Sequence, residues 1–110
     1  MNCWQKRYHQ LYSESKSQFD SHVIELITAK ENFVCNSPYS NPLLKYDFSG
    51  AGIRRYKSGK IRILYALSVE AGNLWDEKPK ASEVIFLYVD LRRDETYSEA
   101  LKAFRRHDVL

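Results

Sequence analysis

The sequence is poor in cysteine, proline and glycine, and it contains no long apolar run. Its two cysteines, Cys3 and Cys35, stand far apart and belong to no CxxC or Cys/His cluster, which excludes a zinc-binding pair. Separated thiols in a chain without a signal peptide predict a reduced, cytoplasmic protein. Residues 1–10 have no apolar stretch of signal-peptide length, and no segment approaches the ~20 apolar residues of a membrane span. We therefore expect a cytoplasmic protein without a membrane partner.

The sequence also lacks the motifs of metal and nucleotide cofactors. His9, His22 and His107 are isolated along the chain, and no acidic pair has the spacing of metal ligands. No glycine-rich loop of the P-loop or dinucleotide-binding type is present, and residues 50–52 are better explained as the start of a strand. We expect neither a metal site nor a cofactor.

The composition is that of one globular domain with clustered positive charge. The chain of 110 residues is 44% hydrophobic and 14% aromatic, so residues 1–110 are expected to form a single domain with a packed core. The formal net charge is only +3, but basic residues crowd into 54–62 and 92–106. A clustered basic surface on a nearly neutral protein predicts a polyanionic partner.

Helical patterns lie at both ends of the chain. Apolar residues recur at steps of three and four from Trp4 to Ile27, which predicts an amphipathic helix. If residues 17–20 cap a second helix, the same segment forms a helical hairpin. Near the other end, Thr96 and Glu99 have the spacing of a capping box and predict a final helix.

The middle of the chain has the pattern of a small sheet. Residues 53–57 and 60–69 predict a β-hairpin whose turn is Ser58-Gly59. Residues 83–89 are continuously apolar, which is typical of a central strand. The order of elements favours an α+β fold, in which an N-terminal helix or helical hairpin packs on a small twisted antiparallel sheet of three to four strands, with a C-terminal helix.

The hairpin places cations on one of its faces. Since side chains alternate along a strand, one face would hold an apolar set and the other the basic set Arg55, Lys57, Lys60 and Arg62. With the turn at Ser58-Gly59, Arg55 lies opposite Arg62 and Lys57 opposite Lys60. Like charges opposite each other destabilise a ladder by a few tenths of a kcal/mol up to ~1 kcal/mol. Such a face favours phosphate binding over a purely structural hairpin.

The run from Arg55 to Tyr65, RYKSGKIRILY, resembles the central hairpin of the RelE/ParE toxin superfamily. That hairpin has the form basic, apolar, basic, any residue, Gly, any residue, apolar, Arg, then an apolar run ending in Tyr. The strand at 83–89, followed by arginines and Tyr97, is similar to the family's last strand, its arginine and its late tyrosine, so the resemblance covers roughly residues 43–104. The chain departs from the family in two ways. Its N-terminus is predicted to be helical from Trp4, where many members begin with a strand, and the turn after the last strand has no histidine.

The resemblance implies a RelE-like endoribonuclease, an mRNA interferase that inhibits translation by cutting messenger RNA on the ribosome. It also implies a cognate antitoxin protein as the inhibitor. By position, the family's catalytic residues correspond to Arg55, Lys57, Arg62, Arg93 (or Arg92 with a shift of one residue) and Tyr97. The remaining assignments are to RNA binding, and they comprise Arg54, Lys60, Arg92, Lys102 and Arg105.

Metal-independent cleavage of RNA uses the 2′-hydroxyl as the nucleophile and needs a base, an acid and cations for the phosphorane. Lys57 or Tyr97 would be the base, because arginine does not deprotonate in proteins. The guanidinium groups around Lys57 would favour its neutral amine. Arg62 and Arg93 would stabilise the phosphorane, and Arg55 would position the backbone.

Three alternatives share the same cations. A ParE-like toxin inhibits DNA gyrase and cuts nothing, although its members generally lack the full basic set. A non-catalytic RNA- or DNA-binding module would use the cations only to neutralise phosphate, with salt-sensitive binding. An inactive member of the family would keep the fold alone.

Overall fold

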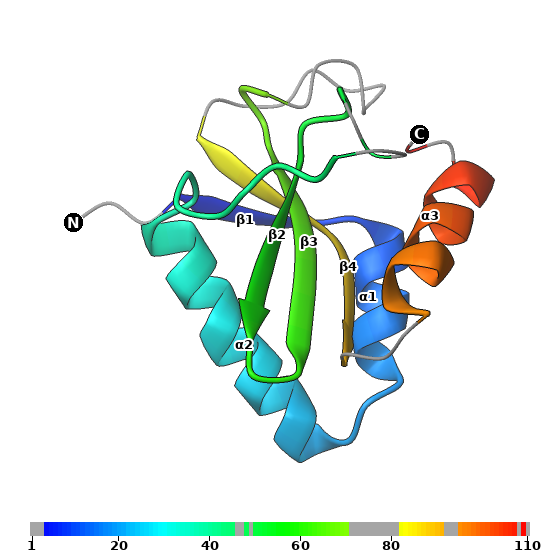
Figure 1. The fold of residues 1–110 in the computed structure, drawn as a ribbon. Coiled ribbons are helices and arrows are strands. Elements are labelled where there is room, and N and C mark those ends of the chain that lie inside the picture. The colour runs from blue at the N-terminus through cyan, green and yellow to red at the C-terminus, as the bar shows by residue number, and fades with distance from the viewer. Residues whose placement is uncertain are drawn as a thin grey trace.

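The computed structural model describes residues 4–45, 48, 50–70, 82–91, 95–107 and 109. Its strands form one sheet in the order β1-β4-β3-β2 (Figure 1). The strands are β1 (Gln5–Tyr8), β2 (Ile53–Ser58), β3 (Ile61–Leu67) and β4 (Glu83–Leu91). β2, β3 and β4 pair antiparallel, as predicted, whereas β1 joins the edge of β4 in parallel, so the sheet is mixed.

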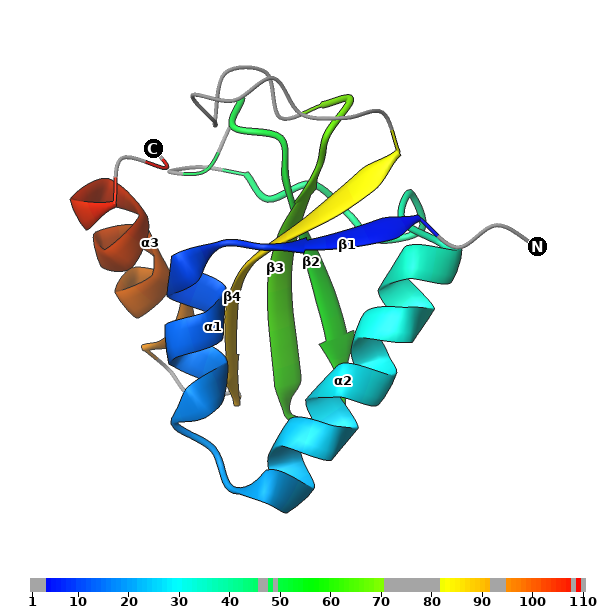
Figure 2. The ribbon, with the colours of Figure 1, turned by 180° about the vertical axis from the view of Figure 1, so that it is seen from behind.

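Three helices cover this sheet on both faces and confirm the α+β class. They are α1 (Gln10–Ser17), α2 (Ser21–Asn36) and α3 (Thr96–Arg106). Residues of α2 pack with Ile63 and Phe86 on one face of the sheet, and residues of α3 pack with Leu64 and Leu87 on the other. α1 contributes a buried side chain to each cluster, so it links the two cores (Figure 2).

The prediction of a helix from Trp4 is wrong for the first residues, because Gln5–Tyr8 form β1. This strand is short, and its partner in β4 is distant in the sequence, with Tyr8 opposite Phe86. Tyr8 and Tyr12, which belong to the predicted helical pattern, are nevertheless in contact, because their rings stack with centroids 5.7 Å apart. The helical hairpin is confirmed beyond this point. Asp20 caps α2, and its Oδ1 accepts a hydrogen bond from the Val23 amide at 3.0 Å.

The β-hairpin forms with a register that differs from the prediction. Ser58 pairs with Ile61 and Lys57 with Arg62, so the turn is Gly59-Lys60 rather than Ser58-Gly59. Gly59 has a φ of 56°, which places it in the left-handed conformation that a two-residue hairpin turn requires at its first position. Each residue of β2 therefore pairs with a residue of β3 two positions further along than predicted, so every side chain stays on its predicted face. One pair of like charges results instead of two, and Lys60 lies in the turn.

The start of α3 also differs from the prediction. Thr96 is the first helical residue, and the capping residue is Glu95, which makes no side-chain hydrogen bond to the helix. The Thr96 hydroxyl instead donates to the Leu91 carbonyl at 3.2 Å, so the capping box is not formed. That bond ties the beginning of α3 to the end of β4, which is two residues longer than the predicted strand at 83–89.

A fully buried carboxylate joins the N-terminal elements. Glu31 of α2 accepts hydrogen bonds from the Tyr8 and Tyr12 hydroxyls, each at 2.7 Å, and from the Lys16 ammonium at 2.8 Å. Lys6 adds a longer contact of 3.4 Å from β1. β1, α1 and α2 are therefore held together by one charge with several donors, as a buried carboxylate requires.

The stability of the fold should fall at acid pH because of this carboxylate. Burial alone raises the pKa of Glu31, but the hydrogen bonds from Lys16, Tyr12 and Tyr8 outweigh it and hold the pKa below its ordinary value. The stabilisation is thus complete above the unfolded pKa of about 4.3 and is lost as the pH falls through the lower folded pKa. Urea titrations between pH 3 and 7 should show this loss, and Glu31→Gln should flatten it. An equally steep decline in Glu31→Gln would assign the acid sensitivity to other groups.

Candidate functional site

The basic face of the hairpin consists of Arg55, Lys57 and Arg62. Lys57 is exposed and lies directly opposite Arg62, while Arg55 lies two residues further along β2 on the same face. Arg62 is buried, and its Nη1 donates to the carbonyls of Gly59 at 2.7 Å and Ile61 at 3.0 Å. On its other side, Arg62 pairs in register with Asp90 of β4. These contacts fix the guanidinium beneath the hairpin turn.

Arg54, which was assigned to RNA binding, does not belong to this face. Its guanidinium forms two hydrogen bonds to the Glu70 carboxylate, at 2.9 and 2.8 Å, and a third to the Asn41 carbonyl at 2.6 Å. It also lies over the Tyr39 ring, with 5.4 Å from Cζ to the centroid. The hydrogen bond to Glu70 raises the pKa of Arg54. Arg54 therefore connects β2 to Glu70, beyond the end of β3, and to the backbone of Asn41, on the α2 side of the sheet.

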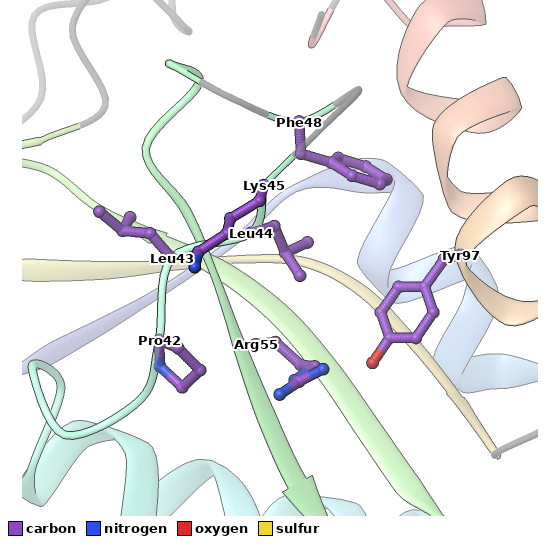
Figure 3. Close-up of a pocket in the computed structure, with 7 residues that line it drawn as sticks. All are labelled: Pro42, Leu43, Leu44, Lys45, Phe48, Arg55 and Tyr97. Carbon is purple, nitrogen blue, oxygen red and sulfur yellow. The ribbon is translucent and has the colours of Figure 1, made fainter.

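A pocket of about 490 Å³ brings Arg55 together with Tyr97. Tyr97 extends into it from the first turn of α3, and Arg55 reaches it from β2 (Figure 3). The remaining lining comes from the segment that precedes β2, and it comprises Pro42, Leu43, Leu44, Lys45 and Phe48. Two residues that the sequence assigned to catalysis from distant positions thus share one cavity.

The Arg55 guanidinium is incompletely satisfied in this pocket. Its Nε is inaccessible to solvent and has no hydrogen-bond partner among the described residues. A buried donor without an acceptor costs about 1–3 kcal/mol. Because the Nε atom is inaccessible to solvent, a ligand in the pocket cannot reach it without a local rearrangement of the Arg55 side chain.

The other predicted cations are less closely associated with the site. Lys60 is exposed in the hairpin turn, and Lys102 and Arg105 are exposed on α3, where Lys102 lies 3.9 Å from Glu99. None of these lines the pocket. Arg92 and Arg93 lie outside the described residues, so their assignments remain predictions.

Residues 42–45 and Phe48 are the part of the site that sequence patterns did not identify. Residues 36–42, NSPYSNP, contain two prolines and two asparagines and are typical of a loop between helix and strand. The available signal was the pair Leu43-Leu44 directly after this loop, since leucine side chains are more often buried than exposed.

Within the described residues, no cluster of three or more histidine, cysteine or acidic side chains has a geometry that could hold a metal ion. Among the helices described, none has the length and apolar character needed to cross a membrane.

Comparison with known proteins gives structural matches only. No family model matches the sequence, and neither does any curated protein. Among solved structures, a RelBE toxin–antitoxin complex from Mycobacterium tuberculosis has a TM-score of 0.66 at 18% identity, covering 86% of this chain and 97% of that one. A mutant of the E. coli toxin RelE in the free state has a TM-score of 0.60 at 21% identity, covering 93% and 98%. The isolated E. coli RelE toxin has a TM-score of 0.55 at 23% identity, covering 92% and 98%.

These similarities show that the chain has the fold of RelE toxins, as the resemblance of its hairpin predicted. Strand β1 also removes one of the two departures from the family, since the chain does begin its fold with a strand.

Proposed function

We propose that this chain is the toxin of a type II toxin–antitoxin pair and that it cleaves messenger RNA on the ribosome without a metal. The observation that carries the proposal is the placement of Arg55, Lys57 and Arg62 on one sheet face, with Arg55 sharing a pocket with Tyr97. The RelE fold of the chain supports it. Cations grouped beside a tyrosine hydroxyl meet the needs of phosphodiester cleavage by the 2′-hydroxyl.

In this proposal Arg55 holds the RNA backbone, while Arg62 and Arg93 stabilise the negative charge of the phosphorane. Arginine suits both tasks, because its planar fork binds phosphate oxygens through two hydrogen bonds and stays charged. Lys57, exposed on the open face, and Tyr97, in the pocket, are the two groups proposed to take the proton of the 2′-hydroxyl. Ribosomal orientation of the message would supply the alignment that a small open site lacks.

The proposed regulator is an antitoxin that covers the basic face. Two of the similar structures are toxin–antitoxin complexes of the RelBE type. An acidic segment that folds on binding would pair with Arg55, Lys57 and Arg62 and occlude the pocket. The proposed location of both toxin and antitoxin is the cytoplasm, where their ribosomal target lies.

The two neighbouring arginines of β2 should respond differently to substitution. Arg55→Ala should weaken binding of a short single-stranded RNA and lower its salt dependence by about one unit, since one phosphate contact is lost. Arg54→Ala should leave RNA affinity unchanged but lower the unfolding free energy by about 1–2 kcal/mol, because the partly buried pair with Glu70 is broken. Fluorescence anisotropy at several salt concentrations and urea unfolding measure the two effects. Equal loss of RNA affinity in both variants would contradict the proposed face.

Induced expression in a bacterium, followed by mapping of RNA 5′ ends, tests the proposed function as a whole. Discrete cuts within translated regions, at codon-related positions, are the expected result. Growth arrest without cuts, accompanied by loss of DNA supercoiling, would instead identify a gyrase inhibitor of the ParE type. Absence of both effects would leave a binding module or an inactive relative.

A further inference from the structure

His9 lies between β1 and α1 and caps the helix with its side chain. Its Nδ1 accepts a hydrogen bond from the Leu11 amide at 3.0 Å, and its own amide donates to the Phe86 carbonyl of β4 at 3.0 Å. The first amides of a helix have no partner within the helix, so a capping side chain must supply an acceptor. An imidazole can do this only while it is neutral, because both nitrogens of the imidazolium are donors. The cap of α1 therefore depends on the protonation state of His9.

A second histidine faces His9 from the end of α3. The rings of His9 and His107 meet edge to face, with centroids 6.2 Å apart, and His107 is the C-terminal capping residue of α3. The His107 amide donates to the Ala103 carbonyl at 3.1 Å. The Val109 amide donates to the Phe104 carbonyl at 2.8 Å, and the Val109 side chain is buried in the core on this face of the sheet. The start of α1 and the end of α3 thus meet through two groups that can both become cations.

The described charged groups near this contact line a cleft of about 260 Å³ between α1, β4 and α3, next to His107. They are Glu14 of α1, Asp90 of β4, and Glu99 and Arg106 of α3. Burial lowers the pKa of His9, the facing His107 lowers it further, and Glu14 offsets these effects only in part. The fold therefore favours the neutral ring. Its contribution to stability is complete above the ordinary pKa of about 6.5 and is lost as the pH falls through the lower folded pKa.

We propose that His9 and His107 form a pH-sensitive joint between α1 and α3, which loosens when His9 is protonated in mildly acid solution. The imidazolium loses its bond to the Leu11 amide, places a cation at the positive end of the α1 dipole, and faces a second imidazolium on α3.

The joint is connected to the candidate site through α3. Phe104, in the last turns of this helix, contacts Phe48 edge to face, with ring centroids 6.0 Å apart. Phe48 lines the pocket into which Tyr97 extends from the first turn of the same helix. Loosening of α3 at its C-terminal end therefore weakens two walls of the pocket, so the joint is a means by which acid regulates the site.

Amide hydrogen exchange of the full chain tests the joint without RNA. Protection of the Leu11, His107 and Val109 amides is compared at pH 7.5 and pH 5, after correction for intrinsic exchange rates. Protection in the wild-type protein should fall about fivefold to tenfold at pH 5, as expected from the loss of one helix cap. The Ile24 amide, which donates to the Asp20 carbonyl at the start of α2, should change by less than about twofold, because no histidine caps that helix.

The three histidines of the chain provide matched variants. His9→Asn keeps an acceptor for the cap but does not titrate, so it should keep its protection at pH 7.5 and lose the acid effect. His107→Asn removes the facing cation and should show a smaller acid effect than wild type. His22→Asn, at an exposed position of α2, should show the full effect. In NMR spectra, the His9 ring resonance, identified by its absence in His9→Asn, should titrate with a pKa below 6.5.

Three results would overturn the proposal. A full acid effect in His9→Asn would assign the effect to other groups. Loss of protection at Leu11 alone, with His107 and Val109 unchanged, would make His9 a cap of α1 and no joint to α3. A His9 resonance that titrates with a pKa above 6.5 would contradict the preference for the neutral ring. If His9→Asn does not fold, His9→Ser, which also caps without titrating, replaces it. None of these measurements requires RNA cleavage, so the joint and the proposed function can fail separately.

Discussion

Replacing Arg62 with alanine should slow RNA cleavage by about 10²–10³-fold, the effect of removing one preorganised group that stabilises transition-state charge. Arg62 is buried and held by the carbonyls of Gly59 and Ile61, so its guanidinium is oriented before the substrate binds. Substrate affinity should change much less than the rate, because the proposed contact strengthens as charge develops on the phosphorane. Single-turnover cleavage on programmed ribosomes measures the rate and the affinity separately.

Two further variants distinguish a catalytic effect from a folding effect. Arg62→Lys keeps the charge but loses the planar fork, so it should recover only a small part of the rate. Lys30→Ala removes a cation on α2, which packs on the opposite face of the sheet, and should cleave within about threefold of wild type. The loss of the turn contacts in Arg62→Ala should cost about 1 kcal/mol of unfolding free energy. A normal cleavage rate in folded Arg62→Ala would remove this arginine from the mechanism.

Replacing Glu31 with alanine should lower the unfolding free energy by about 3 kcal/mol. The Tyr12 hydroxyl is then buried without its acceptor, and Lys16 loses its ion pair in a site where its side chain is only 18% exposed. Burial and the adjacent carboxylate raise the pKa of Tyr12, so its hydroxyl stays protonated and depends on that acceptor. Urea unfolding at pH 7 measures the change.

Glu25 provides the matched control for this prediction. It lies on the same helix but is exposed, and Glu25→Ala should change stability by no more than about 0.5 kcal/mol. Glu31→Gln keeps the shape of the side chain and part of its hydrogen bonding, so its unfolding free energy should lie between those of Glu31→Ala and Glu25→Ala. If Glu31→Ala is as stable as Glu25→Ala, the buried carboxylate does not hold β1, α1 and α2 together.

Sequence patterns predicted the elements that have strong periodicity. The alternation in 53–69 and the apolar run in 83–89 identified β2, β3 and β4, because each strand buries its apolar side chains on the sheet. The same alternation correctly placed Arg55, Lys57 and Arg62 on one face of the hairpin, which also carries the buried Ile53, Leu64 and Ala66. The resemblance to RelE toxins then predicted a fold that structural comparison confirms.

The errors have physical causes that periodicity does not report. β1 is four residues long and depends on pairing with β4, far away in the chain, so no local pattern marks it. The hairpin register depended on whether Gly59 is the first or the second residue of the turn, and either choice keeps the same faces. Arg54 was grouped with its neighbours by charge, although its partner Glu70 lies beyond β3. The pocket wall at residues 42–44 is joined to β2 by two backbone hydrogen bonds and one isolated bridge, which leave no periodic pattern in the sequence.

The chemistry of the cleaved ends tests the central claim most directly. A message carried on ribosomes is cut by purified protein, and the fragments are analysed by mass spectrometry, with a parallel message bearing one 2′-deoxy nucleotide on the 5′ side of the cut. Attack by the 2′-hydroxyl predicts a 2′,3′-cyclic phosphate or its 3′-phosphate product, a free 5′-hydroxyl, and no cut in the deoxy message. Fragments with a 3′-hydroxyl and a 5′-phosphate, or unchanged cleavage of the deoxy message, would contradict the proposed mechanism.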